Sequence, residues 1–150
     1  MNLILALIEQ YYIRMNLLII DDDSICSFVN TRVAQTSGIF KEIRSVHNGK
    51  DALDVFEEAA NGSAEAPDVI LLDLNMPVMN GFDFIEAFQN SSYANKDRLS
   101  IVILTSSDNS VDIQRARTCG IDHYLMKPLT VNELQNTIFS LQNKSGTDER

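Results

Sequence analysis

Five polar side chains that suit metal or phosphate chemistry each stand at the end of a short apolar run. They are Asp21, Asp22, Asp73, Thr105 and Lys127. Together they offer three carboxylates, one hydroxyl and one ammonium group. Each residue type taken singly is common in turns and helix caps, and Asp23 is most simply interpreted that way. Only the joint placement of all five, in order along the chain, is specific.

Three nearby carboxylates raise one another's pKa values unless a cation neutralises them. Mg²⁺ prefers hard oxygen ligands and typically binds through one or two carboxylates together with phosphate oxygens. One carboxylate can then attack phosphorus and form an aspartyl-phosphate, while the metal and the Lys127 ammonium offset charge on the transferring oxygens. We expect Asp73 to be the nucleophile because it ends the most apolar run. We expect Asp21 and Asp22 to hold the metal.

The apolar runs alternate with amphipathic segments, which is the pattern of a parallel sheet covered by helices. The expected strands are residues 17–20, 42–46, 69–72, 101–104 and 124–126. Right-handed connections bring the carboxyl ends of such strands to one edge of the sheet, where ligands bind in open α/β folds. The expected fold class is therefore α/β, with the five polar side chains at one rim.

The helices have recognisable start signals. The first is expected to be capped by Ser24 and to turn four apolar side chains inward. These are Ile25, Phe28, Val29 and Val33. The turn Asn48-Gly49 leads into a second helix, and the capping-box pattern at residues 130–133 opens the last one. Residues 61–67 are small and polar and are expected to form an exposed loop.

Residues 75–81 cannot easily continue a strand or begin a helix. Pro77 restricts Met76 and lacks an amide donor, and Gly81 permits a sharp turn before the helix expected over residues 82–88. The segment is therefore expected to be a loop beside Asp73.

Composition excludes several classes of function. The net charge is −9, from 21 acidic and 12 basic residues, which opposes sequence-independent binding to nucleic acid. Cys26 and Cys119 have no second cysteine or histidine at metal-ligand spacing, so buried free thiols are expected, which fits a reducing cytoplasm. The apolar stretch at residues 3–8 is too short for a membrane span and lacks the basic start of a signal peptide.

Three segments are expected along the chain. Residues 1–14 are an N-terminal extension of unknown role, which either packs on the domain or precedes a true start at Met15. Residues 15–143 form one domain, a size that can close a single core. Residues 144–150 are a polar tail. No output domain follows in these 150 residues.

Four segments give the sequence a close resemblance to the receiver domain of two-component response regulators, over residues 15–143. They are LLIIDDD at 17–23, DVILLDLNMP at 68–77 together with Gly81, ILT at 103–105 and YLMKP at 124–128. The resemblance implies a flavodoxin-like, doubly wound sheet of five parallel strands in the order 2-1-3-4-5, flanked by five helices.

The resemblance also implies a role for each site residue. It places phosphorylation at Asp73, magnesium on Asp22, Asp73 and the backbone carbonyl of Asn75, and a metal-bound water on Asp21. Phosphoryl contacts are implied for Thr105 and Lys127, an inward rotation on phosphorylation for Tyr124, and shaping of the active-site loop for Met76, Pro77 and Gly81.

The partners implied by the resemblance are a histidine kinase or a histidine phosphotransfer protein as donor, and a downstream protein on the face of the fourth helix, fifth strand and fifth helix. The chain is expected to act as a stand-alone switch. No enzymatic activity is expected beyond self-phosphorylation and slow loss of the phosphoryl group. The oligomeric state is left open, with a homodimer as one alternative.

Two other functions compete with a signalling switch. A magnesium-dependent phosphohydrolase of the haloacid-dehalogenase kind also uses an aspartyl-phosphate, but it needs an acid two residues after the nucleophile. Here that residue is Asn75, which cannot act as a general acid. A module that merely binds a nucleotide or flavin would need a glycine-rich phosphate loop, and the sequence has none.

Overall fold

The computed structural model describes all residues except 1, 5, 8–14, 94–95, 107–109 and 146–150. Five parallel strands form one sheet in the order β2-β1-β3-β4-β5. The strands are β1 (Met15–Ile20), β2 (Phe40–Val46), β3 (Val69–Asp73), β4 (Ser100–Thr105) and β5 (His123–Met126). The helices are α2 (Ser24–Ser37), α3 (Gly49–Ala60), α4 (Gly81–Gln89), α5 (Ser110–Thr118) and α6 (Val131–Ser145), with a 3-10 turn η1 at Lys96–Arg98. The predicted fold class and strand order are confirmed.

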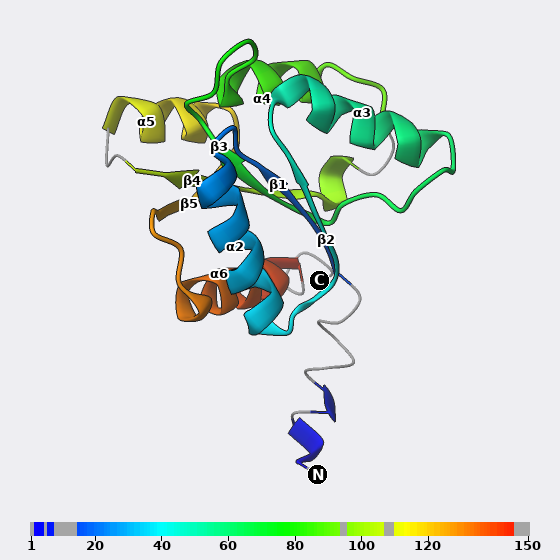
Figure 1. Ribbon diagram of the computed structural model, residues 1–150, viewed down its shortest axis with the longest axis vertical. Coiled ribbons are helices and arrows are strands. Elements are labelled where there is room, and N and C mark those ends of the chain that lie inside the picture. The colour runs from blue at the N-terminus through cyan, green and yellow to red at the C-terminus, as the bar shows by residue number, and fades with distance from the viewer. Residues whose placement is uncertain (1, 5, 8–14, 94–95, 107–109, 146–150) are drawn as a thin grey trace.

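The helices cover both faces of the sheet. Figure 1 shows α2 and α6 below the sheet and α3, α4 and α5 above it. Alternate residues of β1 and β3 therefore enter two separate cores, which explains why both strands are almost continuously apolar. Leu18 and Ile70 pack with α3 and α4, whereas Leu17 and Leu71 pack with α6.

The register of the sheet aligns the carboxyl ends of its strands. Ile20 lies opposite Leu72, and Leu72 lies opposite Ile103. Thr105 lies opposite Met126 at the end of β5. The residues that follow these strand ends are thus delivered to one edge of the sheet.

The predicted inward face of α2 is wrong for three of its four residues, since only Val33 packs against the core. Ile25 is 74% exposed and Phe28 is 63% exposed, and Val29 is also exposed. The helix buries Ser27, Asn30 and Ala34 instead. Small side chains let this helix approach the sheet closely, and the Ser27 hydroxyl forms a hydrogen bond with the Ser45 hydroxyl of β2. Apolar periodicity alone could not distinguish the two faces, because both carry residues that can be buried.

The predicted cap of α2 is also displaced by one residue. Asp23 has extended backbone angles and its carboxylate accepts hydrogen bonds from the N–H groups of Ile25 and Cys26. Ser24 is the first helical residue. An aspartate is a stronger cap here because its negative charge also interacts favourably with the helix N-terminus.

Other predicted features match the structure. Ala52 and Phe56 of α3 are buried, and Leu134 and Ile138 of α6 are fully buried. The Thr130 hydroxyl accepts a hydrogen bond from the Glu133 N–H, as the capping pattern predicts. Residues 61–67 form a mostly exposed loop.

The two cysteines differ slightly from the prediction. Both Cys26 and Cys119 are free thiols, as expected, but each is half-buried rather than buried. Burial nonetheless raises the pKa of the Cys26 thiol, so the thiol form is favoured.

Candidate functional site

Three carboxylates meet at the carboxyl edge of the sheet. One oxygen atom from each of Asp21, Asp22 and Asp73 lies within 4.8 Å of the others. We call these residues the acidic cluster. Asp21 is 1% exposed and Asp73 is 7% exposed, whereas Asp22 is exposed. The cluster therefore combines two buried carboxylates with one that faces solvent.

Lys127 bridges the two buried carboxylates. Its Nζ lies 2.9 Å from Asp21 Oδ2 and 3.5 Å from Asp73 Oδ2. The Lys127 N–H also donates to the Thr105 carbonyl at 2.7 Å, which fixes the chain leaving β5 against the end of β4. One ammonium thus offsets part of the negative charge that two buried carboxylates carry.

Backbone N–H groups orient the same two carboxylates. Asp21 Oδ1 accepts a hydrogen bond from the Asp23 N–H at 2.9 Å. Asp73 Oδ1 accepts one from the Asn75 N–H at 3.1 Å. Both oxygens of Asp21 therefore accept a hydrogen bond of 2.9 Å, one from the Asp23 N–H and one from Lys127. For Asp73, Oδ1 accepts the Asn75 hydrogen bond, and Oδ2 lies 3.5 Å from Lys127.

Burial raises the pKa of Asp73, and the nearby charge of Asp21 acts in the same direction. The Asn75 N–H and the Lys127 charge lower this pKa but do not outweigh burial. For Lys127, burial lowers the pKa, but the hydrogen bond to Asp21 and the charges of both carboxylates raise it more. The two carboxylates therefore favour the ammonium form of Lys127, and further positive charge at the cluster would lower the pKa of Asp73.

Thr105 and Tyr124 occupy different places relative to the acidic cluster. Thr105 is 5% exposed and ends β4, next to the chain that carries Lys127. Tyr124 lies one strand farther out on β5, opposite Ile103, and is 38% exposed. The structure therefore brings Thr105 to the rim and leaves Tyr124 on the outer edge of the sheet.

In the loop after β3, the backbone of Gly81 packs closely against the backbone of Asp73 and Leu74. The Gly81 N–H donates to the Leu74 carbonyl at 3.0 Å. A Cβ atom added at Gly81 would lie 2.8 Å from the Asp73 carbonyl oxygen and 2.8 Å from Leu74 Cα. Gly81 is thus required because backbone segments pack together there. Met76 is buried in this loop.

The residue of this loop that has a positive φ is Val78 and not Gly81. Its φ is 68° and its side chain is 96% exposed. A β-branched residue rarely adopts this conformation, so residue type gave no signal for it. Sequence reasoning also missed the Asp23 N–H as a group that orients Asp21.

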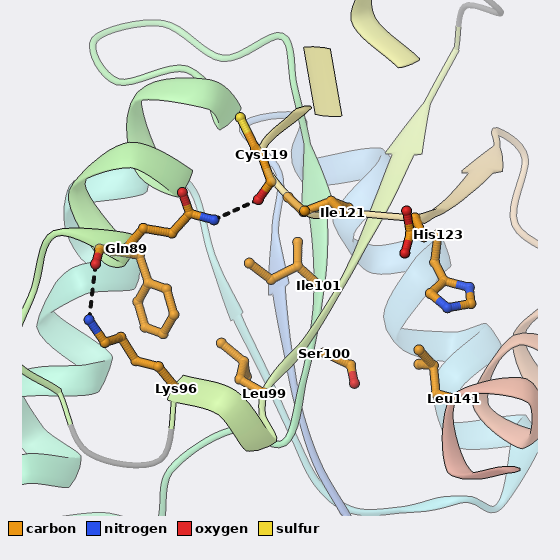
Figure 2. A pocket seen from close by; sticks show the side chains of 12 residues that line it. Gln89, Lys96, Leu99, Ser100, Ile101, Cys119, Ile121, His123 and Leu141 are labelled. Atoms are coloured by element: carbon orange, nitrogen blue, oxygen red, sulfur yellow. Dashed lines mark hydrogen bonds between the residues drawn. The ribbon is translucent and has the colours of Figure 1, made fainter. Parts of the chain in front are cut away.

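Neither histidine belongs to the acidic cluster. His123 lines a groove of about 510 Å³ at the opposite edge of the sheet, together with Gln89, Lys96 and Leu141 (Figure 2). His47 is exposed at the end of β2. Within the described part of the chain, no helix combines the length and the apolar character that crossing a membrane requires.

The acidic cluster and Lys127 lie within a segment that matches a known protein family. The model of the response regulator receiver domain matches residues 17–139. The probable methanogenesis regulatory protein FilR2 of Methanothrix harundinacea is 27% identical over 122 residues, covering 81% of this chain and 77% of that protein. The DNA-binding response regulator MtrA of Mycolicibacterium paratuberculosis is 31% identical over 81% of this chain, which spans about half (48%) of MtrA. The crystal structure of a two-component response regulator from Cytophaga hutchinsonii superposes with a TM-score of 0.77 at 32% identity, over 87% of this chain and 99% of that one.

Proposed function

This chain belongs to the family of response regulator receiver domains, which are phosphorylation-dependent signalling switches, and on that premise we propose that Asp73 is its phosphoryl acceptor. The observation that carries the proposal is the Lys127 ammonium, held between Asp21 and Asp73. A phosphoryl group on Asp73 would lie beside a cation that already faces its Oδ2 atom. Asp21 is less suited to the role because both of its oxygens are engaged.

The proposed step is an in-line displacement at phosphorus. Asp73 Oδ2 forms a new bond to phosphorus, and the bond from phosphorus to the donor breaks. With a phosphohistidine donor, the P–N electron pair stays on the imidazole nitrogen. Lys127 would shift from its contact with Asp73 to the phosphoryl oxygens, whose charge it offsets.

We further propose that the acidic cluster binds Mg²⁺. The donor set fits, because hard carboxylate oxygens lie within 4.8 Å of one another and one of them is exposed to solvent. Asp22, Asp73 and the backbone carbonyl of Asn75 would hold the ion, and Asp21 would hold one of its waters. When bound, the ion supplies positive charge for the phosphoryl oxygens. Asp21 suits an indirect role because Lys127 and the Asp23 N–H occupy its oxygens.

The remaining predicted site residues take supporting roles in this proposal. The Thr105 hydroxyl would contact a phosphoryl oxygen, because Thr105 ends the strand next to β3. Met76 and Pro77 would shape the loop that carries the Asn75 carbonyl, with Gly81 closing it. Tyr124 would rotate inward as Thr105 moves, since β4 and β5 are direct neighbours.

We propose that the donor is a protein histidine, on a histidine kinase or a phosphotransfer protein. Helix α2 follows the acidic pair Asp21 and Asp22 directly and exposes Ile25, Phe28 and Val29. Exposed apolar side chains beside the cluster suit contact with a protein, which supports a protein donor. Downstream targets would bind the face of α5, β5 and α6. That face exposes Val111, Tyr124, Met126 and Phe139, and it is also the surface that a homodimer would use. A cytoplasmic location fits the two free thiols.

A phosphohydrolase has no comparable support. The residue two positions after Asp73 is Asn75, whose backbone N–H orients the Asp73 carboxylate. An amide side chain cannot transfer the proton that such an enzyme moves to its leaving group. We therefore propose that the chain has no activity beyond its own phosphorylation and slow dephosphorylation.

Incubation with acetyl phosphate, followed by intact mass measurement, tests this function. We expect one phosphoryl group per chain, formed with Mg²⁺ and not with EDTA. Asp73→Asn should abolish the adduct, whereas Asp54→Asn, an exposed residue on α3, should leave it unchanged. An adduct that forms without a divalent ion would contradict the metal assignment. Release of many equivalents of phosphate per chain would favour the phosphohydrolase.

A further inference from the structure

The first described residues of the chain expose apolar side chains that belong to neither core. Leu3 is 75% exposed, Ile4 is 65% exposed and Leu7 is 56% exposed. They lie on one helical turn, in which the Ala6 N–H donates to the Asn2 carbonyl at 3.1 Å. Figure 1 shows this turn apart from the sheet, beyond the start of β1. We call it the N-terminal turn, and its three apolar side chains form a patch suited to contact with another apolar surface.

The groove that contains His123 offers such a surface. It lies at the edge of the sheet opposite the acidic cluster and has a volume of about 510 Å³, which is within the range of ligand-binding pockets. We call it the amino-edge groove. Its lining includes Leu99, Ile101 and Leu141, which are half-buried, and the buried Ile121. Figure 2 shows these four side chains around the groove.

The start of β1 lies close to the amino-edge groove. Ser100 begins β4 and lines the groove. It is opposite Val69 of β3, which is in turn opposite Leu17 of β1. Neighbouring strands are about 4.8 Å apart, so two steps across the sheet cover about 10 Å. Gln142 Nε2 also donates to Met15 Sδ at 3.4 Å, which ties the start of β1 to the part of α6 beside the groove.

The segment between the N-terminal turn and β1 is long enough to cross this distance. The eight Cα steps from Leu7 to Met15 can span up to about 28 Å, at about 3.5 Å each. The turn can therefore reach the groove of its own chain. A short tether gives an effective concentration in the millimolar range, which exceeds that of a second copy in dilute solution. The chain's own turn is thus favoured over a second copy as the occupant.

A membrane surface suits the N-terminal turn less well than the groove does. Helices that lie in a membrane interface are rich in Lys and Arg on their polar face. Residues 1–14 contain one basic residue, Arg14, and the net charge of the chain is −9. This charge opposes contact with anionic lipids.

We propose that the N-terminal turn docks Leu3, Ile4 and Leu7 into the amino-edge groove, in exchange with the exposed placement described above. Docking removes apolar surface of both the turn and the groove from water. The contact lies at the edge opposite the acidic cluster, so it leaves the proposed phosphorylation site open. The proposal therefore stands or falls independently of the assignment of Asp73.

A reporter thiol in the groove tests the docking. Ser100→Cys supplies it with little change in size, at a half-buried position in the lining. Adding Leu3→Ser, Ile4→Ser and Leu7→Ser should speed alkylation of this thiol by iodoacetamide at least about twofold, because even equal populations of the docked and exposed placements cover half of the thiols. Peptide mass spectra give the rate. Cys26, in the first turn of α2, is the internal reference and should react at an unchanged rate.

Val78→Ser is the matched control, because it removes an apolar side chain that is 96% exposed near the acidic cluster. It should leave the reporter rate unchanged. An unchanged rate in the triple serine variant overturns the proposal. Binding of the reporter chain to phosphatidylglycerol vesicles, lost in the triple serine variant and combined with an unprotected reporter thiol, would assign the turn to a membrane surface instead.

A disulfide cross-link identifies which chain supplies the turn. Ala6→Cys together with Ser100→Cys, in a chain that also carries Cys26→Ser and Cys119→Ser, should form a disulfide between residues 6 and 100 on mild oxidation. The product should have the mass of one chain. A disulfide-linked dimer would assign the groove to the turn of a second copy and would overturn docking within one chain.

Discussion

Asp21 and Asp73 are both buried, yet their surroundings differ in a way that suggests different roles. Asp21 receives the short contact from Lys127 and the hydrogen bond from the Asp23 N–H. Asp73 has one backbone hydrogen bond and a 3.5 Å contact to Lys127. The better stabilised carboxylate is suited to hold Lys127 in place. We propose that the less stabilised one, Asp73, uses its Oδ2 atom to form the bond to phosphorus.

The raised pKa of Asp73 leads to a pH-dependent stability prediction. Below the unfolded-state pKa near 3.8, this carboxyl is protonated in both states and contributes nothing. As the pH rises through the folded-state pKa, its ionisation costs the folded state more than the unfolded one. Asp73→Asn should therefore raise the free energy of unfolding at pH 7 in EDTA.

Urea unfolding at two pH values measures this difference. The gain from Asp73→Asn should vanish near pH 3, whereas Asp54→Asn should show no comparable gain at either pH. Loss of stability in Asp73→Asn at neutral pH would mean that the Lys127 contact outweighs the cost of burying this carboxylate.

The sequence allowed the meeting of the acidic cluster with Lys127 to be predicted, because strand ends in a parallel sheet share one edge. It did not reveal how they divide their tasks. Lys127 and Asp21 are 106 residues apart, and the distances among their atoms depend on how β5 packs against β4. The positive φ at Val78 was likewise invisible, because residue type argues against it.

At the scale of elements, α2 shows where apolar periodicity fails. Its exposed stripe contains Ile25, Phe28 and Val29, while its buried face is made of Ser27, Asn30 and Ala34. The strands were predictable because burial on both faces requires continuous apolar runs. A helix needs only one buried face, and here small residues allowed the close approach to the sheet.

Alanine substitutions distinguish the two orientations of α2. Phe28→Ala should change the free energy of unfolding by no more than about 0.5 kcal/mol, because Phe28 is 63% exposed. Phe84→Ala, at a fully buried position in α4, should cost about 3–5 kcal/mol. A large loss in Phe28→Ala would show that this side chain faces the core after all.

The loop after β3 gives a second prediction at this scale. Gly81→Ala places a Cβ 2.8 Å from the Asp73 carbonyl oxygen, so backbone must move. We expect a loss of about 1–3 kcal/mol in stability and slower labelling by acetyl phosphate. Gly49→Ala is the matched control, since it too begins a helix and its Cβ mainly meets the flexible Met79 side chain. Equal losses of stability and of labelling rate in the two variants would show that the close backbone contact at Gly81 has no special importance.

At the scale of the whole molecule, one sheet separates two cores and carries the acidic cluster at one edge. The family match covers residues 17–139, and β1 begins at Met15. We propose that residues 15–143 form the domain, that residues 1–14 are an addition to it and that residues 144–150 are a tail. Helix α6 includes the first two residues of this tail, and residues 146–150 lie outside the described part of the chain. The described side chains of Leu3, Ile4 and Leu7 are exposed, which supports this division.

Deletion of residues 2–14 tests the proposed boundary. The shortened chain should unfold within a few degrees of the full chain and accept phosphate from acetyl phosphate at the same rate, because the Met15 strand remains intact. Thermal unfolding and intact mass provide the two readouts. A strongly lowered unfolding temperature would make the first residues part of the domain.

Direct localisation of the phosphoryl group tests the central claim most sharply. Borohydride reduces an aspartyl-phosphate to homoserine, and fragment mass spectra then identify the converted residue. After treatment with acetyl phosphate and Mg²⁺, we predict homoserine at residue 73 and unchanged aspartate at residues 21 and 22. Homoserine at residue 21 or 22, with residue 73 intact, would contradict the assignment of Asp73.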